Sequence, residues 1–171
     1  MARAGAIPFD FNDLGAGTVR AGIRPVLSST ACRPQLDFVK ILGDLVRDHG
    51  KTFRGLAKFQ DAPECHHERV YTAADFEVWL LSWLPGQITP IHDHAGAVTV
   101  TTVLSGSLIE ERFVRTSGLE VRPVWTMPRV AGDLDPIDAT AIHRVRPIGK
   151  AVTLHLYVPS CREGQIYQAV A

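Results

Sequence analysis

The feature that most restricts the fold is a succession of short, strand-like segments that begins near Val70 and continues to Val158. These segments are rich in Val, Thr, Trp and Tyr and are separated by Gly, Pro and Asp turns. They cover residues 76–84, 99–104, 107–115, 121–127, 141–146 and 151–158. Many short strands at near-regular spacing are typical of a sandwich or a barrel, so we expect a mainly β fold.

The part of the chain before these segments has a different character. Residues 1–27 are rich in Gly and Ala without a sustained period, which suggests an arm against the body of the protein. Apolar residues then recur at helical spacing after Pro34, which predicts a helix that ends at Gly50 and a second short helical piece over 53–59. Because no linker or repeat is visible, we expect a single domain over residues 1–171, with an N-terminal arm and helices (1–60) and a β-barrel with the functional site (69–159).

Composition excludes several classes of partner. The 171 residues contain 18 acidic and 18 basic side chains, so there is no electrostatic footprint for nucleic acid or for an anionic membrane. The odd number of cysteines, 3, fits a reducing compartment, and no apolar segment has the length of a signal peptide or membrane span. We therefore expect a cytoplasmic protein with a small-molecule partner. The oligomeric state stays open, with a monomer as the simpler expectation.

A pair of histidines stands out within the strand-rich part. If residues 91–94 are extended, His92 and His94 point to one side of the chain and Asp93 points to the other. A third nitrogen ligand from another strand would complete one face of an octahedral metal site and leave the opposite face open. His143 is the candidate for that third ligand.

The spacing around these histidines matches a known pattern. Gly86 precedes His92-Asp93-His94 by five intervening residues and Gly106 follows twelve positions after His94, while Gly132 precedes His143 by eleven positions. Thr99 stands where the general cupin motif has a glutamate ligand. Together with SWLPGQ before the histidine pair and TLHLY after His143, these motifs resemble the cysteine dioxygenase group of thiol dioxygenases over roughly residues 69–159.

The resemblance implies a cupin fold, that is, a double-stranded β-helix or jelly-roll barrel. It also implies a ferrous ion held by His92, His94 and His143, with dioxygen as co-substrate and a thiol oxidised to a sulfinate. L-cysteine is the leading substrate and cysteine sulfinic acid the product. Three neutral imidazoles leave the ion its full positive charge, which favours an anionic, soft ligand such as a thiolate.

Three further residues have a place in this pattern. Thr153, His155 and Tyr157 share one strand face, and the resembled family has a Ser-His-Tyr triad there, with the phenol near the reactants. Thr153 keeps the hydroxyl of the serine. Thr99 occupies the position at which animal relatives carry a cysteine cross-linked to the tyrosine, so that cross-link cannot form here and the shape of the pocket is affected.

A carboxylate on the substrate would need a cationic partner, and arginine offers the best geometry. Arg69 lies closest to the family's carboxylate-binding position, although an alternative alignment places Ala73 there. Arg162, beyond the last predicted strand, is the rival. His67 falls beside Arg69, where relatives tend to have tyrosine, and is a candidate pocket residue.

Alternatives remain open at this point. The substrate could be another small thiol, such as 3-mercaptopropionate, mercaptosuccinate or a cysteine-derived biosynthetic intermediate. A non-thiol cupin enzyme would need a carboxylate ligand from elsewhere, and a non-catalytic binding protein would have no need for three spaced histidines. The run Cys65-His66-His67-Glu68 contains metal-binding residue types, but adjacent strand residues face opposite ways, so we do not expect a second metal site.

Overall fold

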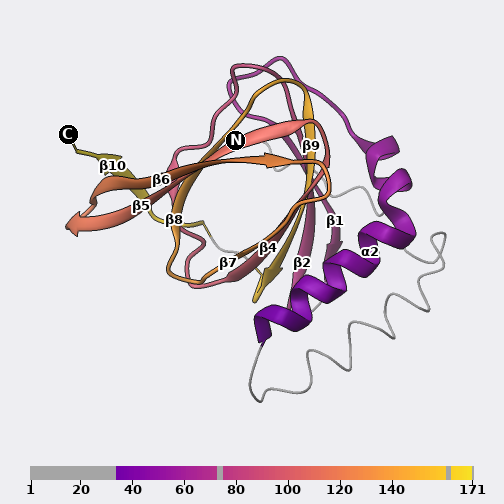
Figure 1. Cartoon of the computed structure of the whole chain (residues 1–171), viewed down its shortest axis with the longest axis horizontal. Coiled ribbons are helices and arrows are strands. Elements are labelled where there is room, and N and C mark those ends of the chain that lie inside the picture. Colours follow the sequence, from indigo (N-terminus) through magenta and orange to yellow (C-terminus); the bar gives the residue numbers. More distant parts are fainter. Residues whose placement is uncertain (1–33, 73–74, 161–162, 171) are drawn as a thin grey trace.

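The computed structural model of the chain describes residues 34–72, 75–160 and 163–170. These residues form one helix followed by ten strands, so the prediction of a mainly β fold is confirmed (Figure 1). The elements are α2 (Pro34–Leu56), β1 (His66–Thr72), β2 (Glu77–Trp83), β3 (Ile91–His92), β4 (Val98–Ser105), β5 (Ser107–Ser117), β6 (Glu120–Val130), β7 (Leu134–Ile137), β8 (Ile142–Pro147), β9 (Ala151–Val158) and β10 (Ile166–Ala169).

The strands form two sheets that the chain visits alternately. One is an antiparallel sheet in the order β1-β2-β9-β4-β7, and the other is a closed barrel in the order β10-β3-β8-β5-β6. Strands that are distant in sequence thus become neighbours, such as β2 with β9 and β3 with β8. Figure 1 shows the paired β5 and β6 extending away from the side on which α2 lies.

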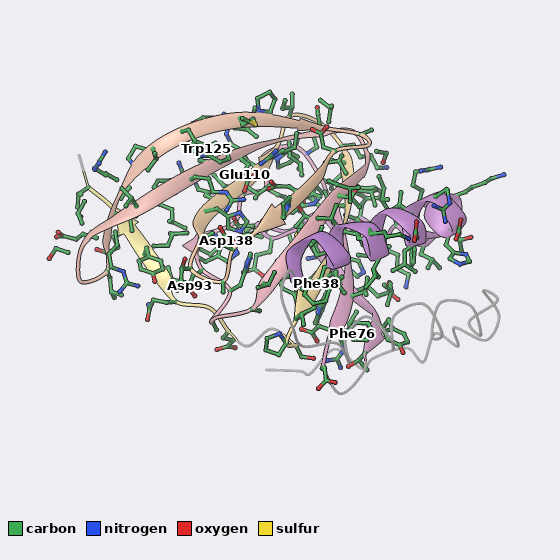
Figure 2. All side chains as sticks on the ribbon, turned by 60° about the horizontal axis from the view of Figure 1, so that its bottom comes forward. Phe38, Phe76, Asp93, Glu110, Trp125 and Asp138 are labelled. Carbon is green, nitrogen blue, oxygen red and sulfur yellow. The ribbon has the colours of Figure 1, made fainter. Side chains whose placement is uncertain are left out.

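The helix α2 covers the outer face of the β1-β2-β9-β4-β7 sheet. Its apolar stripe, which includes Phe38, Leu42 and Phe53, packs with Leu154 and Leu156 of β9 into the largest apolar cluster of the described residues (Figure 2). Burying one such side chain contributes about 1.5–3 kcal/mol, so this contact holds the helix in place. No helix in the described ranges has the apolar length needed to cross a bilayer.

The prediction of two helical pieces separated at Gly50 is wrong. The structure has one continuous helix to Leu56, and Gly50 lies inside it. A glycine in a helix costs about 1 kcal/mol relative to alanine. Phe53 continues the apolar stripe past the glycine and is fully buried against the sheet. The stabilisation from this burial outweighs the cost of the glycine. Residues 1–33, on which we placed the arm, lie outside the described residues.

The strand predictions were also incomplete. The sheet begins earlier than expected, at β1, and the short strands β7 and β10 were not predicted. The segment 91–94 is extended only at Ile91 and His92, because the chain turns after His94 through Ala95, whose φ is 51°, and Gly96. With two to four residues each, β3, β7 and β10 are too short to show an alternating pattern in the sequence.

One glycine of the first motif fixes the approach of two strands. Gly106 lies between β4 and β5 with a φ of 76°, and a Cβ atom there would lie 2.3 Å from the carbonyl oxygen of Lys150. A side chain at this position would therefore push β9 away from the turn. The spacing from His94 to Gly106 reflects this close packing.

Candidate metal centre

His92, His94 and His143 converge on one point inside the described part of the molecule. His92 on β3 and His143 on β8 are direct partners on two adjacent strands of the barrel, and His94 follows two residues after His92. One potential ligand atom from each ring lies within 4.8 Å of the others, and Nε2 of His143 is 3.2 Å from Nε2 of His94. The three histidines predicted as ligands are thus brought together and can hold a metal ion.

The outer nitrogen of each ring is held by a different partner. Nδ1 lies 3.0 Å from the Pro90 carbonyl oxygen in His92, 3.1 Å from Thr99 Oγ1 in His94, and 3.1 Å from Glu110 Oε1 in His143. Since a carbonyl and a carboxylate only accept, His92 and His143 carry their proton on Nδ1. Their Nε2 lone pairs then face the shared point, which is the arrangement that metal-binding histidines have.

Burial keeps these rings neutral. Loss of solvent lowers the pKa of His92 to about 4, with a smaller effect from His143. Burial is also the main cause that lowers the pKa of His94 and His143. When the proton of His94 is on Nδ1, where Thr99 Oγ1 can accept it, the Nε2 lone pairs of His94 and His143 face each other at 3.2 Å and a cation can lie between them. Metal–nitrogen bonds of about 2.0–2.1 Å at right angles separate adjacent ligand nitrogens by about 3 Å, which fits this spacing.

A network of charged side chains lies behind His143 on the barrel side, and we call it the charged wall. Its members are Glu110, Arg112, Arg129 and Asp135. Glu110, on β5, is buried (Figure 2). Its Oε1 accepts from His143 Nδ1, and its Oε2 accepts from Arg129 Nε at 2.8 Å. Arg112 lies 2.6 Å from Glu110 as an ion pair, and Arg112 and Arg129 both contact Asp135. His143 is therefore positioned by a carboxylate that two arginines hold in place.

The two carboxyl groups of this wall respond to burial in opposite ways. Burial would raise the pKa of Glu110, but the hydrogen bond from His143 and the charge of Arg112 outweigh it and lower that pKa strongly. Burial, together with the neighbouring Glu110, raises the pKa of Asp135 to about 6. Glu110 is thus the ionised partner of His143 at neutral pH.

On the sheet side, Thr153, His155 and Tyr157 form a second group, which we call the neutral wall. Trp83 Nε1 donates to Thr153 Oγ1 at 3.0 Å, and that hydroxyl lies 2.8 Å from His155 Nε2. His155 Nδ1 lies 3.5 Å from the Tyr157 hydroxyl, and the Tyr157 ring packs edge-on against His94 at 5.4 Å between centroids. Burial lowers the pKa of His155 to about 3, so this chain from Trp83 to Tyr157 carries no net charge. The three residues predicted from the period of β9 share one face, and Tyr157 among them contacts His94 of the histidine cluster.

Asp93 points away from the cluster and ties it to β10. Its Oδ1 accepts the backbone N–H groups of Ala95 and Gln165 at 2.9 and 3.0 Å, and its Oδ2 accepts from the Tyr167 hydroxyl at 2.7 Å. A Cβ on Gly164 would lie 1.8 Å from the Asp93 carbonyl oxygen. The segment before β10 is therefore locked against the loop that carries His92 and His94, with Asp93 in a structural position (Figure 2).

A cavity of about 440 Å³ opens beside Tyr157. His67 lines it, whereas Arg69 does not but contacts two lining residues: its guanidinium is 5.6 Å from the centre of the Trp79 ring and its Nη1 is 3.4 Å from Glu77 Oε2. Thr99 does not line this cavity, because it is fully buried behind His94. The roles of His67, Arg69 and Thr99 with the substrate remain predictions. Arg162 and Ala73, the alternatives to Arg69, lie outside the described residues.

Sequence reasoning missed two carboxylates, Glu77 and Glu110. Glu110 shares a face of β5 with Leu108 and Arg112, so its period-two position was a signal that it points inward. Glu77 opens β2, whose other residues are apolar except Ser82, and lies on the face of Trp79 and Leu81. The run from Cys65 to Glu68 forms no second cluster in the described ranges, where the histidine trio is the one group of three or more suitable ligands.

Three solved structures have a similar fold. A Klebsiella pneumoniae subsp. pneumoniae protein with a double-stranded β-helix domain aligns with a TM-score of 0.56 and 16% identity, over 67% of this chain and 88% of its own. A Thermus thermophilus protein aligns with a TM-score of 0.52 and 21% identity, over 63% and 93%. A cupin superfamily protein from Desulfitobacterium hafniense aligns with a TM-score of 0.50 and 14% identity, over 63% and 86%. The predicted cupin fold is confirmed.

The family follows from the sequence as a whole. A family model described as cysteine dioxygenase type I matches residues 35–169, which include α2 except its first residue and both walls of the histidine cluster. The match extends well beyond the motif region, and with the three converging histidines it supports a metal-dependent dioxygenase of the cupin class. The chain belongs to the cysteine dioxygenase type I family.

Proposed function

We propose that this protein is an iron(II)-dependent thiol dioxygenase that oxidises L-cysteine with O2 to cysteine sulfinic acid. The observation that supports it most is the convergence of three neutral imidazoles with their Nε2 atoms inward, in a chain of this family. The reaction RSH + O2 → RSO2H balances without a further reductant, because both oxygen atoms end on sulfur.

The residues divide the work in this proposal. His92, His94 and His143 hold the ferrous ion, which when bound supplies open positions for a thiolate and for dioxygen. Tyr157 orients the reactants and holds a proton at its hydroxyl oxygen, while His155 and Thr153 fix the position of that hydroxyl. Arg69 and His67 bind the substrate at the cavity, and Thr99 shapes the site through His94.

The alternative within the same chemistry is a different small thiol. The decisive experiment measures oxygen uptake by anaerobically reconstituted ferrous protein with cysteine, 3-mercaptopropionate, mercaptosuccinate and cysteamine, together with the mass of each product. A mass gain of two oxygen atoms on cysteine supports the proposal. The absence of uptake with every thiol contradicts it and leaves a non-thiol cupin enzyme or a binding protein.

Metal analysis separates those two remaining classes. Protein purified without oxygen and with sufficient iron should contain about one iron per chain, and a chelator should abolish oxygen uptake. Iron-free protein under these conditions would favour a binding function. We also propose, from composition, that the protein works as one domain in the reducing cytoplasm, without a nucleic-acid or membrane partner.

A further inference from the structure

Trp83, which belongs to the SWLPGQ motif, lies beside the neutral wall. It is the last residue of β2 and is only 1% exposed. Leu81 is the direct partner of Thr153 in the pairing of β2 with β9, so Trp83 is the diagonal neighbour of Thr153 on the same face. The register of these two strands therefore places an indole N–H group against the first hydroxyl of the neutral wall, with Nε1 3.0 Å from Oγ1.

An indole nitrogen can only donate, and this determines the role of the Thr153 hydroxyl. A threonine hydroxyl has one hydrogen and two lone pairs, and one lone pair of Oγ1 accepts from Trp83. Among the described residues, the other side-chain contact of this hydroxyl is His155 Nε2 at 2.8 Å. Thr153 is buried, and a buried hydroxyl hydrogen without an acceptor destabilises the folded state. Thr153 therefore donates its hydrogen to Nε2 of His155.

This direction selects one tautomer of His155. An imidazole nitrogen that accepts a hydrogen bond does not carry a proton. Burial lowers the pKa of His155 to about 3, so the ring is neutral and its one proton is on Nδ1. Nδ1 lies 3.5 Å from the hydroxyl oxygen of Tyr157. The N–H group of His155 therefore points to Tyr157, and the phenol oxygen is the acceptor in this contact.

The hydroxyl hydrogen of Tyr157 is consequently directed away from His155. Tyr157 packs on the ring of His94 and lines the cavity of about 440 Å³, so a partner other than His155 receives this hydrogen at the site itself. With the opposite tautomer, Nδ1 of His155 would accept the phenol hydrogen and hold it within the neutral wall. The direction of the hydrogen bonds that starts at Trp83 thus decides where Tyr157 donates.

We propose that Trp83 is a positioning residue that sets the direction of the hydrogen bonds in the resting neutral wall, so that Tyr157 donates to the reactants and not to His155. Trp83 acts through Thr153 and His155 and takes no part in the reaction itself. The consequence for the reaction rests on the proposed thiol oxidation, whereas the tautomer of His155 does not depend on it.

The tautomer is measured by NMR of the full-length protein with ¹⁵N-labelled histidine and with Zn²⁺, which is diamagnetic, in place of iron. The ¹⁵N shifts of an imidazole distinguish its protonated nitrogen from its unprotonated one, and a spectrum of His155→Gln identifies the signals of His155. In wild-type protein, His155 should carry its proton on Nδ1. In Trp83→Phe, the Thr153 hydroxyl is free to accept from His155, so a form with the proton on Nε2 should appear.

Kinetics test the consequence for the reaction. Trp83→Phe keeps an aromatic ring but loses the N–H group, so kcat for thiol-dependent oxygen uptake should fall by about three- to tenfold, the effect expected for one hydrogen bond. KM and iron content should change much less than kcat. Thr153→Ser keeps the hydroxyl and should keep the proton of His155 on Nδ1. The matched control is Trp125→Phe on β6, which removes an indole N–H group outside the neutral wall and should match wild-type protein in tautomer and kcat.

The possible failures are distinguishable. A wild-type His155 with its proton on Nε2, or a Trp83→Phe variant with the wild-type tautomer, overturns the role of Trp83 but leaves thiol oxidation standing. A changed tautomer with the wild-type kcat overturns the consequence for the reaction. No oxidation of any thiol by the wild-type protein overturns the proposed function instead, while the NMR spectra still decide the direction of the hydrogen bonds. Where Trp83→Phe does not fold, the wild-type spectrum decides, since a proton on Nε2 contradicts the inference.

Discussion

The two walls that meet at the histidine cluster are built on different physical principles. On the barrel side, His143 is held by Glu110 within a network of charges that includes Arg112, Arg129 and Asp135. On the sheet side, Thr153, His155 and Tyr157 form a chain of neutral hydroxyl and imidazole groups. A cavity of about 30 Å³, large enough for a single water molecule, lies between the walls.

This difference suggests a division between holding and reacting. Ion pairs in a buried environment are strong and directional, so the charged wall fixes the orientation of His143. Hydroxyl and imidazole groups can exchange roles as donor and acceptor, so the neutral wall can hold and pass a proton. The barrel side should therefore determine metal affinity, and the sheet side should determine the rate.

The largest effect on metal binding should follow from removing His143, the histidine that contacts the charged wall through Glu110. His143→Ala deletes one of three ligands and leaves Glu110 without its histidine partner, so we expect metal affinity to fall by more than about 100-fold and oxygen uptake to vanish. Metal titration and oxygen uptake measure this. His49→Ala, on α2, is the control and should bind metal normally. A His143→Ala protein with full iron content would remove His143 from the site.

The next effect tests the neutral wall. Tyr157→Phe keeps the ring that packs on His94 but deletes the hydroxyl, so we expect kcat to fall by roughly 100-fold, the lower end of the range for lost proton transfer. Iron content and melting temperature should stay unchanged. Tyr71→Phe, on β1, is the control and should keep the wild-type kcat. A Tyr157→Phe variant that instead lost iron would contradict the division between the walls.

The charged wall is tested by a smaller change. Glu110→Gln keeps the shape but removes the charge that orients His143, and loss of such a partner typically lowers metal affinity by about 10–100-fold. At saturating iron, kcat should change much less than in Tyr157→Phe. The control is Glu111→Gln, on the same strand as Glu110, which removes an ion pair with Arg144 of β8. Equal losses of kcat in Glu110→Gln and Tyr157→Phe at saturating iron would show that the walls do not differ in function.

The sequence carried more information about the neutral wall than about the charged one. Thr153, His155 and Tyr157 are consecutive alternate residues of one strand, so the period of two suffices to place them on a single face. The convergence of His92 and His143 followed from motif spacing, although the pairing of β3 with β8 that produces it was not visible.

The charged wall depends on contacts between strands that no local pattern reveals. Arg112 is the direct partner of His143 in the pairing of β5 with β8. Glu110 lies two residues before Arg112 on the same face of β5, and this places its carboxylate within reach of His143. Arg129 comes from β6 and Asp135 from β7, so the network joins residues of four strands. Glu77 reached Tyr157 through the same kind of pairing, between β2 and β9. Predicting these residues requires the register of the sheets, which a single sequence does not contain.

The smallest effect concerns the response of the two walls to acid in metal-free protein. Burial lowers the pKa of His155 to about 3, so in the folded state it stays neutral while the unfolded state takes up a proton below about pH 6.5, and stability is lost as the pH falls. Asp135 acts in the opposite direction. Its pKa is raised to about 6, so the folded state keeps a proton that the unfolded state releases above about pH 4, and stability is gained as the pH falls through 6.

Asp135→Asn should therefore make the acid destabilisation steeper. Between pH 7 and 5.5 the wild-type protein gains stability from Asp135, on the order of 1 kcal/mol, and this opposing contribution disappears when the side chain no longer titrates. The measurement is the free energy of unfolding by urea at both pH values in the presence of a chelator, with exposed Asp61→Asn as the control. The substitution also changes the contacts of this side chain with Arg112 and Arg129, and this change is present at both pH values. The informative quantity is thus the change in the free energy of unfolding between pH 7 and pH 5.5. If this change were the same in Asp135→Asn as in wild type, Asp135 would be ionised throughout this range and the charged wall would hold no proton.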